Sequence, residues 1–456
     1  MAISVARKIA FEVLRRVEEE GAYASDLLHS ELGAGVKAED AGLATELVLG
    51  VLRWRRLLDF LLEPQLKKGL AKLDVAVALA LRMGLYQLRF LGRVPARAAV
   101  NESVELVKRA RKASAATLVN AVLRRAAGEA GRPAVEFLPA DVAGAERLGI
   151  LHSHPTWMVE RWIERFGEAR TIGLIEADNR APRLSCALRD LSRREEIFDG
   201  LRAGGLRVEA GEILRGAFAV GGGSVARTSA FRDGLISIQD EASQVVPLLL
   251  GVREGERVLD MCAAPGGKTT ALARAAGRAG LVVAADLHAH RLRGMREQFG
   301  RMGLRDVRLV ELDASRSLPF GVMFDQILVD APCSGTGTLG RHPEIRWRLK
   351  AGALEEFHAL QVALLRSGLE RLAAGGRLVY STCSLEAEEN ELVVEEVLRG
   401  ARGVRLVPER DLMGALDGKL VAGVDPRTLF DAAGYFRTLP GEWNADGFFA
   451  AGFARE

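Results

Sequence analysis

Cysteine is scarce in this chain of 456 residues, which contains four cysteines, Cys186, Cys262, Cys333 and Cys383. They lie 50 or more residues apart along the sequence, so no CxxC pair and no cluster of metal ligands is present. A disulfide-stapled fold and a zinc site are therefore excluded, and we expect no bound metal.

Long apolar runs are also missing. No stretch of about 18 uncharged apolar residues occurs, so we expect no membrane-spanning helix. The first residues, MAISVARKIAFEVLRRVEEE, contain charges throughout and lack the apolar centre of a signal peptide. These absences predict a cytoplasmic protein.

Acidic residues are few in one part of the chain. The net charge of the whole chain is only +3, but residues 50–132 hold 17 basic and 6 acidic residues. Such a local excess attracts phosphate backbones and favours nucleic-acid binding. A solvated basic surface would give the same pattern, so charge alone leaves both interpretations open.

The first 130 residues have helical periodicity. Apolar residues recur every three or four positions in VARKIAFEVLRRVEE, ATELVLGVLRWRRLLDFLL and LDVAVALALRMGLYQLRFL. Asp74 and Asn101 stand where helix N-caps are expected. We predict a helical bundle over residues 1–140.

After a proline-containing linker, a helix opened by Pro155 and short apolar runs predict a small α+β module over 151–232.

From residue 233 to 456, short β-rich runs alternate with segments of helical spacing. The runs are RVLDMC, GLVVAADL, VRLVELD, FDQILVDAP and GGRLVYSTC. This alternation predicts a doubly wound α/β domain with a mainly parallel sheet. The whole chain is therefore predicted to be multidomain, and ligands of the last domain should bind at the carboxyl ends of its strands.

A glycine-rich turn, DMCAAPGGKTT (260–270), follows the first of these strands and opens a helix. Small residues let the backbone approach a ligand, and free amides at a helix start suit a carboxylate or phosphate. GGKTT is similar to part of a P-loop, but the first glycine of that motif would stand at position 262, which is Cys262. The dinucleotide GxGxxG pattern also fails, so we expect a nucleotide-like ligand bound in another way.

Acidic residues follow successive predicted strands. Asp286 ends the second strand and is placed to accept hydrogen bonds from ribose hydroxyls, while Asp313 ends the third and is placed to meet an adenine edge. Isolated acids at strand ends are usually caps. The series of Asp260, Asp286, Asp313 and Asp330 favours a ligand pocket.

Cys333 and Cys383 each follow a predicted strand, in DAPCSGTG and YSTCSL. Neither lies in an apolar run, and a thiolate attacks electrophilic carbon well. A thiolate that adds to carbon 6 of cytosine makes carbon 5 able to accept a methyl group from a sulfonium. A proton donor near the ring nitrogen and a base for the carbon 5 proton complete the chemistry, and two cysteines with one acid supply three such groups.

These motifs closely resemble those of the Sun/Nop2 family of RNA cytosine carbon-5 methyltransferases, and QDEASQ (239–244) and DGFFAAGF (446–453) match flanking motifs. The resemblance implies a seven-stranded, S-adenosylmethionine-dependent methyltransferase fold. It implies Cys383 as nucleophile, Cys333 as the residue that helps release product, and Asp330 facing the base. The implied cofactor pocket consists of Cys262, Ala263, Ala264, Pro265, Gly266, Gly267, Lys268, Asp286, Asp313 and Asp330.

The helical part, with VLRWRRLLDFLL, LRMGLYQLRFL and LVNAVLRR, resembles the NusB family of RNA-binding domains. This pairing of domains resembles family members that act on naked or partly assembled small-subunit ribosomal RNA, and we expect a monomer that binds no membrane and no DNA. Three alternatives remain: the same chemistry on transfer RNA, a non-enzymatic antitermination factor, and a DNA cytosine methyltransferase. The DNA enzymes use the cysteine after the DAP-like proline and do not need Cys383.

Overall fold

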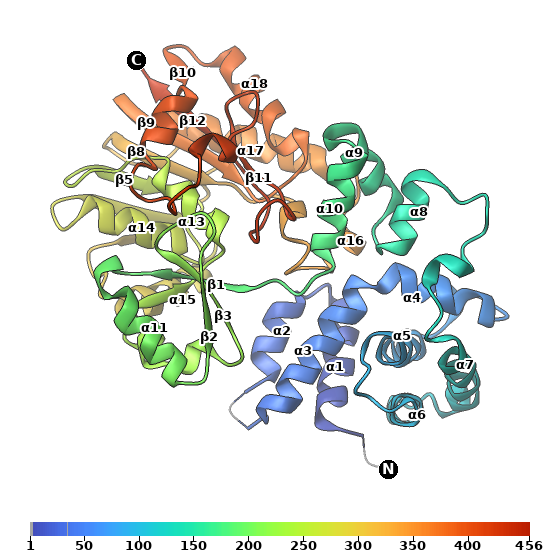
Figure 1. Cartoon of the computed structure of the whole chain (residues 1–456). Coiled ribbons are helices and arrows are strands. Elements are labelled where there is room, and N and C mark those ends of the chain that lie inside the picture. Colours follow the sequence, from blue (N-terminus) through green and yellow to red (C-terminus); the bar gives the residue numbers. More distant parts are fainter. Residues whose placement is uncertain (1–2, 34) are drawn as a thin grey trace. The chain divides into compact units, whose positions relative to one another are not determined.

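The computed structural model describes residues 3–33 and 35–456, and its contacts divide the chain into two compact units (Figure 1). One unit comprises Met1–Ala181 and Leu339–Arg348, and the other comprises Pro182–Thr338 and Leu349–Glu456. The division at residue 181 lies inside the expected middle module, and a short stretch after the DAPCSGTG motif groups with the helices. The division of the chain into three domains, which the sequence predicts, stays a prediction.

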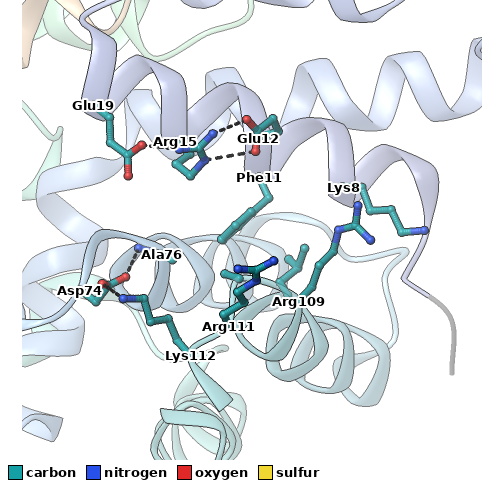
Figure 2. Close-up of a pocket in the computed structure, with 12 residues that line it drawn as sticks. Lys8, Phe11, Glu12, Arg15, Glu19, Asp74, Ala76, Arg109, Arg111 and Lys112 are labelled. Atoms are coloured by element: carbon teal, nitrogen blue, oxygen red, sulfur yellow. Dashed lines mark hydrogen bonds and ion pairs between the residues drawn. The ribbon is translucent and has the colours of Figure 1, made fainter. Parts of the chain in front are cut away.

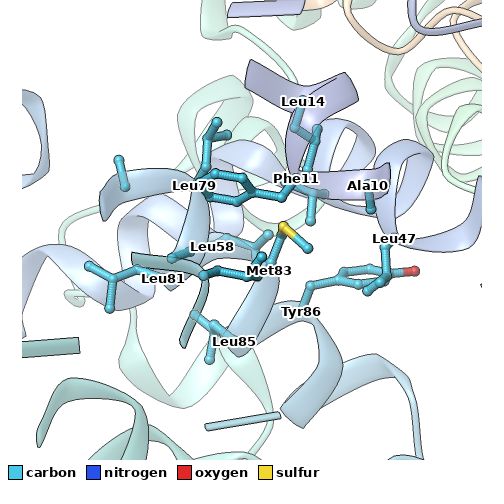
Figure 3. Packing of buried hydrophobic residues seen from close by; sticks show 14 of the residues in the cluster. Ala10, Phe11, Leu14, Leu47, Leu58, Leu79, Leu81, Met83, Leu85 and Tyr86 are labelled. Atoms are coloured by element: carbon cyan, nitrogen blue, oxygen red, sulfur yellow. The ribbon is translucent and has the colours of Figure 1, made fainter. Parts of the chain in front are cut away.

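The first unit is helical, as the periodicity predicts. Its longer helices are α1 (Val5–Glu20), α2 (Ala24–Glu31), α3 (Ala38–Arg53), α4 (Arg55–Leu62), α5 (Val75–Phe90), α6 (Ala96–Arg109), α7 (Ala116–Glu129), α8 (Gly144–Leu151), α9 (Thr156–Phe166) and α10 (Glu168–Asp178). Helix α5 is buried from Ala76 to Gln87 on all sides, which explains its nearly unbroken apolar sequence. Figure 3 shows Phe11 and Leu14 of α1 and Leu47 of α3 packed with Met83 of α5.

The two predicted N-caps have different outcomes. The carboxylate of Asp74 accepts a hydrogen bond from the backbone amide of Ala76 at the start of α5, so this cap is confirmed. The prediction for Asn101 is wrong, because this residue lies inside α6. Helix α6 begins directly after Pro95, whose fixed φ angle suits a helix start.

A short helix from the later part of the sequence, α16 (Ile345–Arg348), is embedded in the first unit. Arg346 is 1% exposed, and its Nη1 donates to the backbone oxygens of Arg53 and Ser153 and to Oδ1 of Asn179. Its Nη2 donates to the backbone oxygen of Asp178. These bonds replace the water that a buried guanidinium loses, and they anchor the segment among the helices.

The second unit contains a small sheet and a large sheet. The small antiparallel sheet has the order β2-β3-β1-β4 and is formed by β1 (Leu184–Leu188), β2 (Arg207–Ala210), β3 (Ala217–Gly221) and β4 (Ile236–Ile238). Helix α11 (Arg194–Ala203) packs Ile197, Phe198 and Leu201 into the core that the sheet forms. Strands and a helix are thus combined from residue 182 onward, whereas residues 151–181 of the expected α+β module are helical and belong to the first unit.

The large sheet has the order β10-β12-β9-β8-β5-β6-β7, with β11 paired to β12. Strands β5 (Arg257–Asp260), β6 (Leu281–Asp286), β7 (Arg308–Glu311), β8 (Phe324–Asp330) and β9 (Leu372–Thr382) are parallel, which confirms the doubly wound prediction. Strands β10 (Val404–Leu406), β11 (Phe436–Thr438) and β12 (Phe448–Arg455) add an antiparallel edge. The strand order reverses at β5, where ligands of such sheets bind.

Helices accompany the parallel strands. They include α13 (Glu241–Leu248), α14 (Gly267–Ala276), α15 (Ala289–Arg301), α17 (Ala353–Glu370), α18 (Glu391–Gly400) and α19 (Glu409–Gly414). Among the described residues, no helix is long and apolar enough to span a membrane.

Candidate active site

Two cysteines lie beside each other just beyond the ends of neighbouring strands. Strands β8 and β9 pair in parallel with Asp330 opposite Ser381, so both chains leave the sheet at the same edge. The Sγ atoms of Cys333 and Cys383 are 3.3 Å apart. The hydrogen bond with Cys383 and burial raise the pKa of the Cys333 thiol well above its ordinary value. Cys333 therefore keeps its proton at neutral pH and is able to donate it to the neighbouring sulfur.

A buried carboxylate that the sequence analysis did not single out holds the loops of both cysteines. Glu389 accepts hydrogen bonds from the backbone amide of Ser334 at 2.8 Å and from the hydroxyl groups of Ser334 and Ser384. Gln361 Nε2 donates to the same carboxylate at 3.0 Å. Glu389 belongs to the acidic run EAEENE, which in sequence is typical of a solvated turn. Only its position shortly after YSTCSL could have drawn attention to it.

Lys268 and Asp330 form an ion pair at the same edge of the sheet. Lys268 Nζ lies 2.7 Å from Asp330 Oδ2, and Ser381 donates its hydroxyl to Oδ1 at 2.7 Å. The ammonium group also lies 5.1 Å from the centre of the Phe448 ring. Asp330 thereby connects the glycine-rich turn to the end of β9, so two sequence-predicted residues are in direct contact.

The glycine-rich turn runs from the end of β5 to the start of α14. Gly266 has a φ angle of 102°, and a side-chain carbon there would lie 3.0 Å from the Phe299 ring. Glycine alone fits this conformation without strain. The amide of Ala263 donates to the backbone oxygen of Ala285, and the amide of Ala264 donates to the carboxylate of Asp286. The turn is therefore held against the end of β6.

Asp260 offers an unsatisfied acceptor beside this turn. Its Oδ2 accepts a hydrogen bond from the Thr269 hydroxyl at 2.7 Å, whereas its buried Oδ1 has no hydrogen-bond partner in the described part of the chain. Burial raises the pKa of Asp260 to about 7 and raises that of the Cys262 thiol well above its ordinary value. Cys262 is thus an uncharged thiol. The Oδ1 atom of Asp260 is a buried acceptor that lacks a hydrogen-bond donor, which is unfavourable until a ligand supplies one.

Asp286 and Asp313 both have local structural partners. Asp286 accepts from the backbone amides of Ala264 and His288, and Arg291 Nη1 lies 3.4 Å from it. A carboxylate has about four acceptor positions, so about one remains for a ribose hydroxyl. Asp313 accepts hydrogen bonds from the amide and the hydroxyl of Ser315, two residues further on. Such local bonds, which resemble a helix cap, are common for isolated acidic residues.

Residues 3–33 and 35–456 contain no group of three or more His, Cys, Asp or Glu side chains able to hold a metal ion. The candidate site therefore consists of a glycine turn, strand-end acids and two adjacent thiols. A sheet whose order reverses at β5, with these groups at its carboxyl edge, defines a doubly wound α/β domain of the methyltransferase type.

Comparison with known proteins specifies the family. Residues 247–454 match the family described as 16S rRNA methyltransferase RsmB/F, and residues 4–128 match the NusB family. A protein of Bacillus subtilis (strain 168), described as a probable ribosomal RNA small subunit methyltransferase B, is 34% identical over 97% of either chain. Ribosomal RNA small subunit methyltransferase B of Pseudomonas syringae pv. tomato is 35% identical over 85% of either chain. This chain belongs to the 16S rRNA methyltransferase RsmB/F family.

Solved structures agree with this placement. The crystal structure of the protein PH0851 covers 100% of either chain with a TM-score of 0.81 and 26% identity. A methyltransferase homologue from Pyrococcus horikoshii is 30% identical, with a TM-score of 0.57, and covers 70% of this chain and 100% of its own. The resemblances expected from the sequence, to a NusB domain and to this class of RNA methyltransferase, are confirmed.

Proposed function

We propose that this chain transfers a methyl group from S-adenosylmethionine to carbon 5 of a cytosine in small-subunit ribosomal RNA through a covalent adduct with Cys383. The observation that carries the proposal is the 3.3 Å separation of the Cys333 and Cys383 sulfur atoms at the edge that holds the Lys268–Asp330 pair. A fold that only bound RNA would have no need for two adjacent thiols beside a ligand turn.

The two thiols suit successive steps. The sulfur of Cys383 forms a bond to carbon 6, and the electron pair of the ring double bond moves toward carbon 5, which then takes the methyl group. A base removes the carbon 5 proton, the double bond re-forms and the carbon–sulfur bond breaks, returning the Cys383 thiolate. Cys333 assists this release. Because Cys333 keeps its proton, its S–H group is able to stabilise the neighbouring sulfur as an anion.

Asp330 is the acidic residue that we assign to contact the cytosine ring. Its two carboxylate oxygens are bound by Lys268 and Ser381, so its position at the end of β8 is fixed from two sides. When carbon 6 is attacked, negative charge grows on the ring nitrogen, and Asp330 passes to that nitrogen a proton that the Lys268 ammonium supplies. The lysine ammonium beside it is a proton donor with a defined position.

The residues of the glycine turn fit S-adenosylmethionine. The buried Oδ1 of Asp260 lacks a donor in the described part of the chain, and an amino acid ammonium group would supply one. Residues 262–268, Asp286, Asp313 and Asp330 are those we expect to hold the cofactor. When bound, S-adenosylmethionine supplies an electrophilic methyl group on a sulfonium. The acids at this edge complement that positive charge.

The helical unit provides a basic cavity for RNA. A cavity of about 560 Å³ lies among α1, the end of α6 and the start of α5 (Figure 2). Of its cations, Arg15 pairs with Glu12, and Lys112 pairs with Asp74. Within the described residues the side chains of Lys8, Arg109 and Arg111 form no ion pair or hydrogen bond, although the charge of Arg109 helps to lower the pKa of Glu12. These three cations are available for phosphate contacts.

Methylation of deproteinised 16S ribosomal RNA, mapped by bisulfite sequencing, tests the proposal. We expect one protected cytosine that depends on the protein and on S-adenosylmethionine. Transfer RNA serves as the parallel substrate. Modification of transfer RNA alone would overturn the ribosomal assignment, and methyl transfer to any atom other than cytosine carbon 5 would overturn the chemistry.

A further inference from the structure

The spacing of Cys333 and Cys383 needs a cause, because the two residues lie on separate loops after β8 and β9. We propose that Glu389 is a positioning residue that keeps the sulfur atoms of Cys333 and Cys383 at the separation that the reaction needs. The inference rests on the proposed function of the thiols. In the described part of the chain Glu389 forms no hydrogen bond to either sulfur, although its charge contributes to the raised pKa of the Cys333 thiol. It is hydrogen-bonded to the residue that follows each cysteine, Ser334 and Ser384.

The loops are connected to each other as well as to the carboxylate. The hydroxyl groups of Ser334 and Ser384 lie 3.1 Å apart, and the amide of Gly337 donates to the backbone oxygen of Cys383 at 2.8 Å. The hydroxyl of Thr336 accepts from the amide of Leu385 at 2.8 Å. Glu389 is itself fixed, because Tyr380 donates its hydroxyl to the backbone oxygen of Glu389.

The chemistry of the contacts requires a carboxylate. Glu389 is 0% exposed, and every group that donates to it is neutral, so no cation accounts for its burial. Both of its oxygens accept from two donors. A glutamine would present one oxygen and an amide that itself donates, and so would lose part of this set. Burial raises the pKa of Glu389, and the hydrogen bonds from Ser334, Ser384 and Gln361 oppose that rise. The geometry of these four donors, rather than its charge, is what connects Glu389 to both loops.

The test compares Glu389→Gln and Glu389→Ala with Glu395→Gln, which changes an exposed carboxyl on α18. Both Glu389 variants should lower kcat at least tenfold while the KM for S-adenosylmethionine stays within twofold. Oxidation by diamide reports the thiol spacing directly, because it joins Cys333 to Cys383 only when the sulfurs are close. We expect the rate of this joining to fall at least fivefold, with Glu389→Gln milder than Glu389→Ala.

Ser384→Ala, which deletes one donor to Glu389, keeps the proposal testable if the Glu389 variants fail to fold. It should show a smaller loss of both kcat and joining rate. Wild-type joining rates in every variant would overturn the positioning role, even with reduced activity. Because the joining rate needs no RNA, this result is distinct from a failure of the proposed function.

An independent observation concerns a second cavity beside α14. A cavity of about 350 Å³ is lined by the helix face that carries Thr270 and Arg274, by the chain after β1, and by Lys419. Its apolar wall is formed by Leu188, Leu191, Leu214 and Leu248. Gly267 of the glycine turn also lines the cavity, whereas the next residues, Lys268 and Thr269, bond to Asp330 and Asp260. The cavity therefore adjoins the glycine-turn site but does not include its strand-end acids.

This cavity contains a guanidinium group whose buried nitrogens have no hydrogen-bond partner among the described residues. Nε and Nη2 of Arg274 are buried and have no hydrogen-bond partner in the described part of the chain. Burial and the nearby Arg189 lower the pKa of Arg274 to about 10, and burial lowers the pKa of Lys419. The acid in the lining, Asp190, is exposed and is bonded to Ser192, and the charge of Arg189 helps to lower its pKa. Burying guanidinium nitrogens without a hydrogen-bond acceptor is unfavourable in free energy, and a bound anion would supply the missing acceptors.

We infer that this cavity binds one ribonucleotide of the substrate RNA strand, with the phosphate on Arg274 and Arg189 and the base against the leucine wall. The volume suits a ligand of nucleotide size. A strand of RNA is the favoured source because the proposed function brings one to this unit. A free nucleotide has the same chemistry and is distinguished by experiment.

Fluorescence anisotropy with a labelled five-residue oligoribonucleotide, repeated with cytidine monophosphate as competitor, tests the site. Arg274→Gln should weaken oligoribonucleotide binding at least fivefold, and the exposed Arg278→Gln should bind as wild type. Equal binding by Arg274→Gln would overturn the site. If cytidine monophosphate bound as tightly as the strand and depended on Arg274, the assignment to the RNA strand would be overturned.

Discussion

Lys268 Nζ and Asp330 Oδ2 lie 2.7 Å apart and join the glycine turn to the loop that precedes Cys333. The pair consists of an acid and a proton donor that both belong to the predicted cofactor residues, at the sheet edge where the thiols lie. Replacing Asp330 with asparagine keeps the shape but removes the charge that holds Lys268. We expect kcat to fall by about 10²- to 10⁴-fold, the usual size of a lost acid–base group, in single-turnover methylation. Ser381→Ala removes only the other partner of Asp330 and should retain most activity.

The two cysteines should fail in different ways. Cys383→Ala should abolish turnover and form no covalent complex with RNA, because the first bond to carbon 6 cannot form. Cys333→Ala should still add and methylate but stall before release, and so accumulate protein attached to methylated RNA. Denaturing gels of both variants measure this adduct. An adduct with Cys383→Ala and none with Cys333→Ala would mean that the roles are reversed.

Cofactor affinity should depend on Asp286. Asp286→Ala removes a carboxylate with about one free acceptor position, and a hydrogen bond to a charged group contributes about 1.5–3 kcal/mol. Calorimetry should therefore show at least about a tenfold weaker Kd for S-adenosylmethionine. Arg293→Gln, an exposed change on the same helix α15, is the control for local disturbance. Unchanged affinity in Asp286→Ala would exclude the ribose contact.

The basic cavity of the helical unit should set the salt dependence of RNA binding. The triple change of Lys8, Arg109 and Arg111 to glutamine removes three cations, so the slope of log K against log salt should fall by roughly 2–3. Affinity for S-adenosylmethionine should stay at the wild-type value. Lys67→Gln, an exposed change in the same unit, provides the control. The same slope in wild type and triple variant would show that these side chains are only solvated.

Stability should depend on pH through Asp178. Burial raises its pKa from 3.8 to about 7, although Arg346 and Arg53 oppose the shift, and its partner His154 has a pKa well below its ordinary value. A raised carboxyl pKa adds stability that is full below about pH 4 and is lost as pH rises through about 7. As the pH rises from 4 to 8, the free energy of unfolding of Asp178→Asn should therefore increase by up to about 4 kcal/mol relative to that of the wild type.

Urea unfolding of the two proteins at both pH values measures this difference. Asp199→Asn, at an exposed position that pairs with Arg202, should show no comparable trend. A constant difference between wild type and Asp178→Asn across the range would contradict the burial of an ionisable carboxyl at this position.

Much of the site was predictable because its residues follow strands that have a strong local signal. The parallel strands are short β-rich runs, and the residue after each run must lie at the carboxyl edge of the sheet. Asp260, Asp286 and Asp330 therefore lie where the pattern predicts. Glu389 was not predictable in this way, because nothing local distinguishes it from its solvated acidic neighbours. Its partners come from loops that are 55 and 5 residues away along the chain.

The sequence by itself determined the helical first part, the alternation of strands and helices, and the motifs at strand ends, since each depends on residues close together in the chain. Tertiary structure alone decided the order reversal at β5, the antiparallel β12 and the embedding of Arg346 among the helices. It also decided the 3.3 Å approach of two cysteines that are 50 residues apart. These features arise from hydrogen bonds and burial between distant segments, which no local pattern encodes.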